Sequence, residues 1–459
     1  MDIWFALYAA LSLVSSLALL SSPYLRITSL GWFIAVWALP YVGALFFILT
    51  VVRAKKSAHN HAICHMLDEH RGDVCQHGKV EKLGMSYEFL PYFHMNSAEI
   101  LKDDAFVTSV CEAIDQATER VWITTYIFSG QVKEKVMAKL TDAHGRGVDV
   151  KLLIDRIGCG LFLASRDNPL GESVPFDVSV FHESRARSFM FMEKRLHSKI
   201  VLADDDAFIG AHNLRDEVIA SHDDSVHNVS LKFSGSVVGQ LEAVFVDLWK
   251  LNTGTELAAS SEIHAHEEAQ CHEDDRPTEH EGAPARIIFS DPIEREHNYN
   301  AYLGDLFFAA TKRVYIWMPY IVPSHAMRRS IIAASKLGLD VRVLFPKVSD
   351  SPLVDNAHAL VLKEFCDNGV SCALSTGDFD HSKILIIDDV VVLGSTNLDY
   401  RSLYRNYEAN IEVNDADFSE SIAEMFYQVF DASEKASDCD VGRVVHIKNQ
   451  LTSLIAALY

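Results

Sequence analysis

Two stretches of the sequence carry the same spaced set of side chains that could act on a phosphate ester. Each set consists of a histidine, a lysine, an aspartate, a glycine and an asparagine, in that order. The members are His197, Lys199, Asp204, Gly210 and Asn213 in the first stretch and His381, Lys383, Asp388, Gly394 and Asn397 in the second. The offsets from the histidine are identical in both sets, so neither chance nor a pair of buried core histidines explains them well.

Two histidines that face each other could divide the work of phosphodiester chemistry. One imidazole would attack phosphorus and form a phosphohistidine. The other would protonate the leaving alkoxide and then remove a proton from the incoming alcohol or water, which suits a group with a pKa near neutrality. Lys199 and Lys383 would balance the charge on the phosphate oxygens, and Asn213 and Asn397 would donate further hydrogen bonds. Because lysines neutralise the charge, this chemistry requires neither a metal nor another cofactor.

The neighbouring residues indicate how each set is positioned. Side chains two residues apart on a strand share a face, so each histidine should lie beside its lysine. The apolar residues that follow predict a strand covered on both sides. The Asp-Asp pairs that begin at Asp204 and Asp388 suit tight turns, where we expect these aspartates as structural supports of the site. Gly210 and Gly394 lack side chains where the chain must leave the strand beside the site.

A second repeat places the two sets in two similar lobes. The β-rich runs that start at Arg120 and Arg313 are each followed by a predicted helix and then by an apolar strand. The helices are expected at 132–144 and 325–336, and the strands at 148–154 and 339–345. Strand, helix and strand in this order form a βαβ unit. The sequence therefore predicts an α/β protein with two lobes, each a mixed β-sheet flanked by helices, in a pseudo-twofold arrangement.

The N-terminal part contains two uncharged apolar runs, 3–24 and 30–52, each long enough to cross a bilayer as a helix. A secretory signal peptide is the alternative for the first run, but it would need a basic n-region and only Asp2 precedes the run. A basic cluster at 53–56 follows the second run, so the positive-inside rule places the remaining chain in the cytoplasm. Arg26, in the loop between the runs, weakens this bias.

These features divide the chain into five segments. We expect a transmembrane hairpin at 1–56, a juxtamembrane His- and Cys-containing segment at 57–90, a first lobe at 91–252, an acidic linker at 253–283 and a second lobe at 284–459. The juxtamembrane segment and the linker each carry several histidines, so a metal site is an alternative there. Their spacing matches no zinc template, and we interpret both as solvated connections.

The composition restricts the class of partner. The formal net charge is −22, from 41 Lys+Arg and 63 Asp+Glu. This acidity argues against a nucleic-acid partner, which would need a basic surface. It does not argue against an anionic lipid, because the hairpin would supply attachment to the membrane and the two lysines would meet the phosphate locally. The 8 cysteines include no C-x-x-C pair and are expected to be reduced in the cytoplasm.

The duplicated pattern His-x-Lys-x-x-x-x-Asp, with Gly and Asn after it, resembles the signature of the phospholipase D superfamily. Two copies behind a membrane hairpin are similar to the bacterial cardiolipin synthases. The further segments that resemble this family are Leu39-Pro-Tyr-Val-Gly43, Asn213-Leu-Arg-Asp-Glu217, Met318-Pro-Tyr-Ile-Val-Pro323, Gly394-Ser-Thr-Asn-Leu-Asp-Tyr-Arg-Ser402 and Asn406-Tyr-Glu-Ala-Asn410.

The resemblance implies two phospholipase D-like lobes in a multi-pass enzyme of the bacterial inner membrane. It implies phospholipid substrates, with two phosphatidylglycerols giving cardiolipin and glycerol, and it implies His197 as the nucleophile and His381 as the acid and base. A phospholipase D that uses water, a membrane-tethered nuclease and an inactive lipid-binding scaffold are the alternatives. The two intact sets speak against the scaffold, and the acidity speaks against the nuclease.

Two positions distinguish the histidines from each other. Counting back from Gly235, Asn228 stands where the first lobe of the family usually has a carboxylate, and Glu408 is its counterpart in the second lobe. We therefore expect Glu408 to orient His381 and to stabilise its cation. The amide of Asn228 could orient an imidazole but could not stabilise its charged form, so the two histidines are predicted to differ electrostatically.

Overall fold

The computed structural model describes residues 78–161, 170, 173–181, 194–216, 226–257, 282–293, 298–350, 352–375 and 377–436, all within one compact unit. The predicted hairpin at 1–56, most of the juxtamembrane segment and most of the acidic linker lie outside these residues, as do their histidines and cysteines. Within the described ranges, no helix is long and apolar enough to cross a membrane. The hairpin and the segment boundaries therefore stay predictions.

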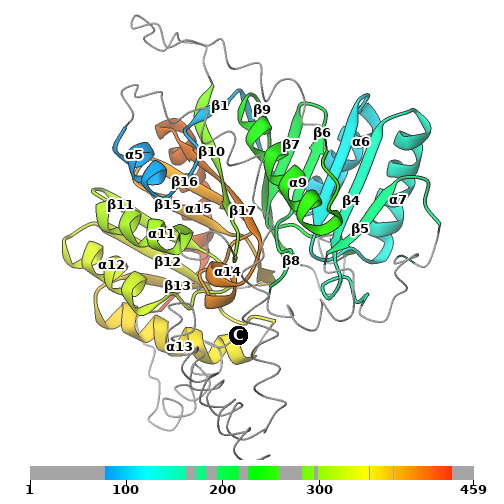
Figure 1. The fold of residues 1–459 in the computed structure, drawn as a ribbon. Helices are drawn as coiled ribbons and strands as arrows, with labels where there is room; N and C mark the ends of the chain where they lie inside the picture. Colours follow the sequence, from blue (N-terminus) through cyan, green and yellow to red (C-terminus); the bar gives the residue numbers. More distant parts are fainter. Residues whose placement is uncertain are drawn as a thin grey trace, which may run out of the picture. The chain divides into compact units, whose positions relative to one another are not determined.

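The described residues form two lobes, each built on a mixed β-sheet (Figure 1). The strands of the first sheet, in spatial order, are β2 (Ser97–Lys102), β9 (Val229–Ser234), β7 (Asp206–Gly210), β6 (Ile200–Ala203), β3 (Arg120–Thr125), β4 (Asp149–Asp155) and β5 (Asp177–Phe181). Those of the second are β1 (Phe93–Met95), β10 (Ala283–Ser290), β17 (Glu408–Asn414), β16 (Val390–Gly394), β15 (Ile384–Ile387), β11 (Arg313–Trp317), β12 (Asp340–Pro346), β13 (Ser371–Ser375) and β18 (Glu434–Lys435).

The predicted βαβ repeat is confirmed in both lobes. In the first lobe, β3 continues into helix α7 (Gly130–Gly145) and then into β4, which is parallel to β3. In the second, β11, helix α12 (His325–Lys336) and β12 repeat this order, and β11 and β12 are again parallel. The strands β6 and β15, which follow the histidines, pair antiparallel with β3 and β11. The two sets of site residues therefore enter their sheets at equivalent positions.

Helices cover both faces of each sheet (Figure 1). The packing of apolar side chains places α6 (Asp104–Gln116) and α7 on one face of the first sheet, and α11 (Asn298–Ala309), α12 and α13 (Pro352–Asp367) on one face of the second. The other faces share a core with α9 (Val237–Thr253) and α15 (Ala416–Ala432).

Alternate residues of the central strands enter different cores, which explains their nearly continuous apolar sequence. On β15, for example, Ile384 and Ile386 face the shared core, whereas Leu385 and Ile387 face the outer core of the second lobe. Strands covered on both sides were predicted after each histidine, and this prediction is confirmed.

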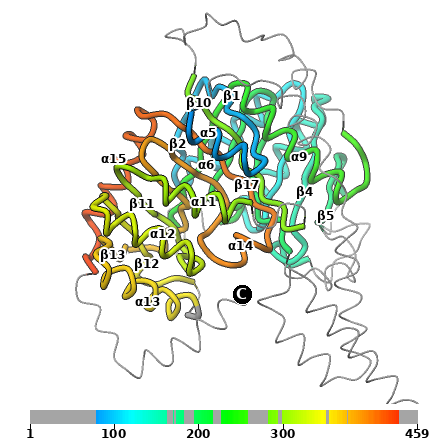
Figure 2. The backbone as a smooth tube through the Cα atoms, turned by 60° about the vertical axis from the view of Figure 1, so that its left-hand side comes forward, coloured from blue at the N-terminus to red at the C-terminus, as the bar shows by residue number. Residues whose placement is uncertain are grey.

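The chain that precedes the first lobe also packs on the second. Helix α5 (Lys79–Ser86) contributes to the outer core of the second lobe, and β1 pairs antiparallel with β10, whereas β2 joins the sheet of the first lobe. Figure 2 shows α5 beside β1 and β10. The buried guanidinium of Arg286 fixes this segment, because it donates to the carbonyl oxygens of Val80 and Glu81 and forms an ion pair with Glu412 at 2.6 Å.

Candidate active site

The chain just before His197 pairs with the second lobe. Leu196 forms a parallel bridge with Tyr407, whose carbonyl oxygen accepts hydrogen bonds from the backbone N–H groups of His197 at 3.0 Å and Ser198 at 2.8 Å. Because Glu408 is the next residue after Tyr407, this pairing brings its carboxylate to the first-lobe histidine.

The chain before His381 makes the equivalent contact with the first lobe. Strand β14 (Phe379–Asp380) pairs parallel with β8 (Val226–His227), and the N–H of His381 donates to the carbonyl oxygen of His227 at 2.7 Å. Asn228, the next residue after β8, consequently lies beside the second-lobe histidine.

The expected pairing of Glu408 with His381 is therefore wrong. Both oxygens of Glu408 lie 2.9 Å from Nδ1 of His197, and Oδ1 of Asn228 lies 3.1 Å from Nδ1 of His381. The physical reason is the exchange of strand partners between lobes, because each orienting residue follows a segment that pairs with the other lobe. The predicted electrostatic difference between the histidines holds, but the carboxylate belongs to His197.

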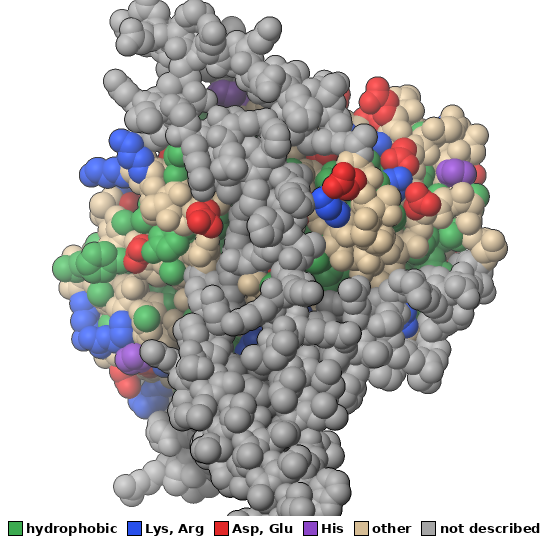
Figure 3. Space-filling view, viewed as in Figure 1, with side chains coloured by type: hydrophobic (Ala, Val, Ile, Leu, Met, Phe, Trp, Pro, Cys, Tyr) green, Lys and Arg blue, Asp and Glu red, His purple; other side chains and the backbone are tan. Residues whose placement is uncertain are grey.

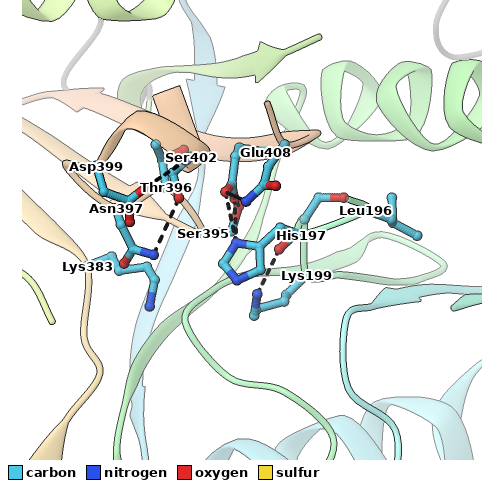
Figure 4. A network of polar contacts seen from close by, with 12 residues as sticks. Leu196, His197, Lys199, Lys383, Ser395, Thr396, Asn397, Asp399, Ser402 and Glu408 are labelled. Atoms are coloured by element: carbon cyan, nitrogen blue, oxygen red, sulfur yellow. Dashed lines mark hydrogen bonds and ion pairs between the residues drawn. The ribbon is translucent and has the colours of Figure 1, made fainter. Parts of the chain in front are cut away.

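Glu408 is fully buried and accepts hydrogen bonds from three side chains. Besides His197, its donors are the hydroxyl of Ser395 at 2.5 Å and Nδ2 of Asn406 at 3.1 Å (Figure 4). Burial raises the pKa of Glu408, but the charge and hydrogen bonds of its neighbours outweigh burial and hold the pKa below its ordinary value. Glu408 is thus a carboxylate, and Nδ1 of His197 carries the hydrogen that it accepts.

His197 is neutral before the reaction. Burial outweighs the attraction of Glu408 and lowers the pKa of the imidazole to about 4. With the hydrogen held on Nδ1, the lone pair lies on Nε2, and the carboxylate fixes the plane of the ring. An imidazole in this state has a lone pair free to attack an electrophile, and Glu408 would stabilise a positive charge that then developed on the ring.

The two lysines lie on one side of the His197 ring although they come from different lobes. In Figure 4 both amino groups lie below this ring, that of Lys199 just beneath it and that of Lys383 further to the left. Each amino group donates to the carbonyl oxygen of its own histidine, at 2.7 Å for Lys199 and 2.8 Å for Lys383. Strands β6 and β15 begin one residue after these lysines, so each histidine and lysine lies in the extended segment before its strand.

Both lysines are almost completely buried, with exposed fractions of 4% for Lys199 and 1% for Lys383. Burial lowers the pKa of Lys199 to about 8. The pKa of Lys383 is lowered well below its ordinary value, by burial and then by the charge of Lys199. Burial and mutual repulsion disfavour the charged forms of both lysines unless an anion lies beside them, so the geometry suits a bound phosphate.

The two predicted asparagines are buried beside the site. Oδ1 of Asn213 accepts from the N–H of Ile127 at 3.2 Å, and Nδ2 of Asn397 lies 3.4 Å from Oγ of Ser402. Asn213 thus helps to hold the loop after β3, and its predicted donation to a phosphate stays a prediction, as does that of Asn397.

The aspartates of the two sets lie at the other ends of the short strands, about 16 Å along the extended chain from the lysines. Asp204 and Asp388 occupy the turns between β6 and β7 and between β15 and β16, with positive φ angles of 48° and 54°. Each carboxylate accepts three backbone N–H groups at the start of β3 or β11. This is the geometry of structural supports rather than of groups that touch a substrate.

The two glycines permit close packing of the site strands. A Cβ atom on Gly394 would lie 2.4 Å from Oδ1 of Asn410, and one on Gly210 would lie 2.3 Å from Oγ of Ser230. No side chain fits in either place, and β7 and β16 end at these glycines, which agrees with the expectation that glycine is needed where the chain leaves the strand beside the site.

Several site residues were not identified from the sequence. Ser395 and Asn406 hold Glu408, and Asp155, at the end of β4, accepts from the N–H of Leu196 at 3.1 Å just before His197. The ring of Tyr126 lies 5.1 Å from that of His197. Ser395 and Asn406 lie within the segments 394–402 and 406–410 that resemble the family, and this position could have identified them as site residues. Nothing in the sequence singles out Asp155.

Among the described residues, no group of three or more His, Cys, Asp or Glu side chains is placed to hold a metal ion. The histidine-containing segments at 57–77 and 258–281 lie outside these residues.

Two repeated α/β lobes that meet at a duplicated His–Lys site define a protein of the phospholipase D superfamily. Residues 110–249 and 303–430 match the family described as "Cardiolipin synthase, PLD-like domain". The chain belongs to this family and is a cardiolipin synthase-like enzyme of the phospholipase D superfamily.

Relatives and a solved structure agree with this assignment. The minor cardiolipin synthase ClsB of Bacillus subtilis is 29% identical over 316 residues, which cover 67% of this chain and 75% of that protein. A cardiolipin synthase of Clostridium perfringens is 23% identical over 421 residues, or 87% of each chain. The crystal structure of a phosphatidylserine synthase from Haemophilus influenzae matches 83% of this chain and 100% of its own with a TM-score of 0.62 and 14% identity, which shows the fold.

Proposed function

We propose that this enzyme transfers a phosphatidyl group from one phosphatidylglycerol to a second, which gives cardiolipin and releases glycerol. The observation that carries this proposal is the pairing of His197 with Glu408 across the lobes, beside two buried lysines from both lobes. It combines an oriented neutral nucleophile with a cationic pocket for the phosphate. The curated relatives named cardiolipin synthase supply the choice of lipid.

In the first half of the reaction, Nε2 of His197 attacks phosphorus and the bond from phosphorus to the head-group glycerol oxygen breaks. The leaving alkoxide takes a proton from His381, and glycerol departs. The phosphatidyl group stays on His197 as a phosphohistidine, whose positive ring charge Glu408 stabilises. Lys199 and Lys383 balance the negative charge on the phosphate oxygens.

In the second half, a hydroxyl of the second phosphatidylglycerol gives its proton to His381 and attacks phosphorus. The bond between phosphorus and Nε2 breaks, and the electron pair returns to His197. The enzyme ends this step with His381 protonated and His197 neutral, as it was when the first phosphatidylglycerol was bound. Water in place of the hydroxyl would give phosphatidic acid, so exclusion of water decides between transferase and hydrolase.

Attachment to a membrane follows from the predicted hairpin at 1–56. By the positive-inside rule it would place both lobes at the cytoplasmic face of the bacterial inner membrane. On the described part of the face in Figure 3, acidic and basic side chains are interspersed rather than gathered into a continuous basic surface. This distribution and the net charge of −22 favour a lipid substrate over a nucleic acid.

The test is product analysis with the full chain in detergent. Phosphatidylglycerol should yield cardiolipin and free glycerol in equal amounts. Phosphatidic acid as the main phospholipid product would overturn the transferase proposal in favour of a hydrolase, and cleavage of nucleic acid alone would overturn the choice of substrate. His197→Ala and His381→Ala should each abolish turnover. His144→Ala, an exposed histidine at the end of α7, is the matched control and should retain it.

A further inference from the structure

The two half-sites differ in the charge that faces each histidine. Nδ1 of His197 meets the carboxylate of Glu408, whereas Nδ1 of His381 meets the amide oxygen of Asn228 at 3.1 Å. A histidine that acts as an acid is usually kept protonated by a partner that stabilises its cation. An amide stabilises an imidazolium less than a carboxylate does. The amide thus stands beside the histidine that the proposed reaction requires to be protonated.

The orientation of this amide is fixed by a second hydrogen bond. Nδ2 of Asn228 donates to the carbonyl oxygen of Val226 at 3.0 Å, so Oδ1 must be the atom that faces His381. Nδ1 of His381 then carries a hydrogen and donates it. The amino group of Lys383 lies 3.0 Å from Nε2 and 3.1 Å from Nδ1, so its charge faces the ring as a whole rather than one nitrogen. A hydrogen on Nδ1 and a cationic group beside the ring both suit a neutral imidazole.

The groups around His381 oppose a second proton. Burial is the largest cause that lowers the pKa of His381, and the charges of Lys383, Lys199 and Arg215 lower it further. The adjacent Asp380 is turned to other donors, because it accepts from Nε1 of Trp317 at 2.8 Å and from the N–H of Ser382.

Two further neighbours of His381 are aromatic. The rings of Tyr320 and Phe379 lie 6.1 Å and 5.9 Å from that of His381. They offer no negative charge that could stabilise an imidazolium.

We propose that Asn228 is a positioning residue that keeps His381 neutral in the free enzyme, and that the negative charge of the bound substrate phosphodiester stabilises the protonated form of His381. The inference rests on the proposed function, since it concerns the acid of the first half-reaction. Solvent provides one proton to His381 when the lipid binds, and that proton later leaves with glycerol. The proton that His381 takes from the second phosphatidylglycerol returns to solvent when cardiolipin departs. An enzyme without bound lipid thus lacks its general acid.

The inference predicts that kcat/KM and kcat depend differently on pH. The pH dependence of kcat/KM reports the free enzyme, and that of kcat reports the enzyme–substrate complex. Between about pH 6.5 and 7.5, kcat/KM of the natural enzyme should fall about tenfold per pH unit because one proton is taken up on binding, while kcat stays flat.

Asn228→Asp places a carboxylate beside His381 and should make kcat/KM flat in the same range. Asn414→Asp is the matched control, because it makes the same change at the far end of β17, about 20 Å along the strand from Glu408. It should keep the slope of the natural enzyme. Identical slopes in the natural enzyme and Asn228→Asp would overturn the inference.

A binding measurement separates this inference from the proposed function. The probe is a short-chain phosphatidylglycerol analogue in which a P–C bond replaces the head-group P–O bond, so that glycerol cannot leave. Calorimetry in buffers of different ionisation enthalpy should show uptake of about one proton by the natural enzyme at about pH 7 and almost none by Asn228→Asp or His381→Gln.

Uptake that persists in His381→Gln, or none in the natural enzyme, would overturn the inference. Neither result depends on which products the enzyme makes. Phosphatidic acid in the product assay would instead overturn the transferase proposal and leave the proton measurement valid.

Discussion

Glu408→Gln is the substitution that most directly tests the electrostatic role of the carboxylate behind His197. It keeps the size of the side chain and removes the charge that faces Nδ1. With about 4 Å between the carboxylate charge and the imidazole charge, and an effective dielectric constant of about 20, their attraction is about 4 kcal/mol. Because this attraction exists only when the ring becomes cationic, its loss should lower kcat by about three orders of magnitude.

The assay is the release of glycerol and the formation of cardiolipin by Glu408→Gln at saturating phosphatidylglycerol. KM should change little, because the lysines that bind the phosphate are untouched. Glu242→Gln is the matched control, since Glu242 is also a buried carboxylate, paired with Arg120 at 2.7 Å in the first lobe. It should lower stability and leave kcat within a few-fold. A kcat of Glu408→Gln within tenfold of the natural value would refute the reasoning.

Further predictions concern stability and pH. Asp388→Ala removes the acceptor of three backbone N–H groups and should destabilise the fold by about 2–3 kcal/mol, measured as a lower Tm, while KM stays unchanged. A large loss of kcat without a loss of stability would contradict the supporting role of Asp388. Arg286→Met leaves the buried carboxylate of Glu412 without its cation and should cost about 3–5 kcal/mol in chemical denaturation; an unchanged midpoint would contradict this. Burial lowers the pKa of Lys199 to about 8, so the residue loses its charge as the pH rises through that value, and KM for phosphatidylglycerol should rise more steeply above about pH 8 than below it. Lys199→Arg stays charged and should remove this added steepness; equal profiles would count against the lysine.

Much of the architecture could be predicted because the repeat carries it locally. The strand–helix–strand order, the tight turns at Asp204 and Asp388 and the close approach at Gly210 and Gly394 each follow from residue types at short spacing. These features depend on propensity and on steric fit within one lobe, both of which can be read within a window of a few tens of residues.

The partners of the histidines could not be predicted in the same way. Glu408 and His197 are separated by 211 positions, and so the hydrogen bond between them depends on how the two lobes meet. The assumption that each lobe is self-contained assigned Glu408 to its own histidine, whereas the bridge between Leu196 and Tyr407 exchanges the partners. A pairing that crosses lobes has no short-range signal, because it is determined by packing between two sheets.

The packing of the segment before the first lobe has a similar origin. Apolar side chains of α5 and the short strand β1 join the second lobe, which the sequence order does not reveal. The buried Arg286 provides the attachment, and a lone arginine in a β-strand is not distinctive before its partner Glu412 is known.

The central claim is that His197 carries the phosphatidyl group during the reaction. The most direct measurement is a rapid quench of the full-length enzyme with phosphatidylglycerol that carries a labelled phosphate, under alkaline conditions that preserve phosphohistidine, followed by digestion and mass spectrometry. The label should appear on the peptide that contains His197 and be lost when unlabelled phosphatidylglycerol is added, with labelled cardiolipin formed in step. A label on the peptide that contains His381, or cardiolipin formed without any labelled peptide, would contradict the account.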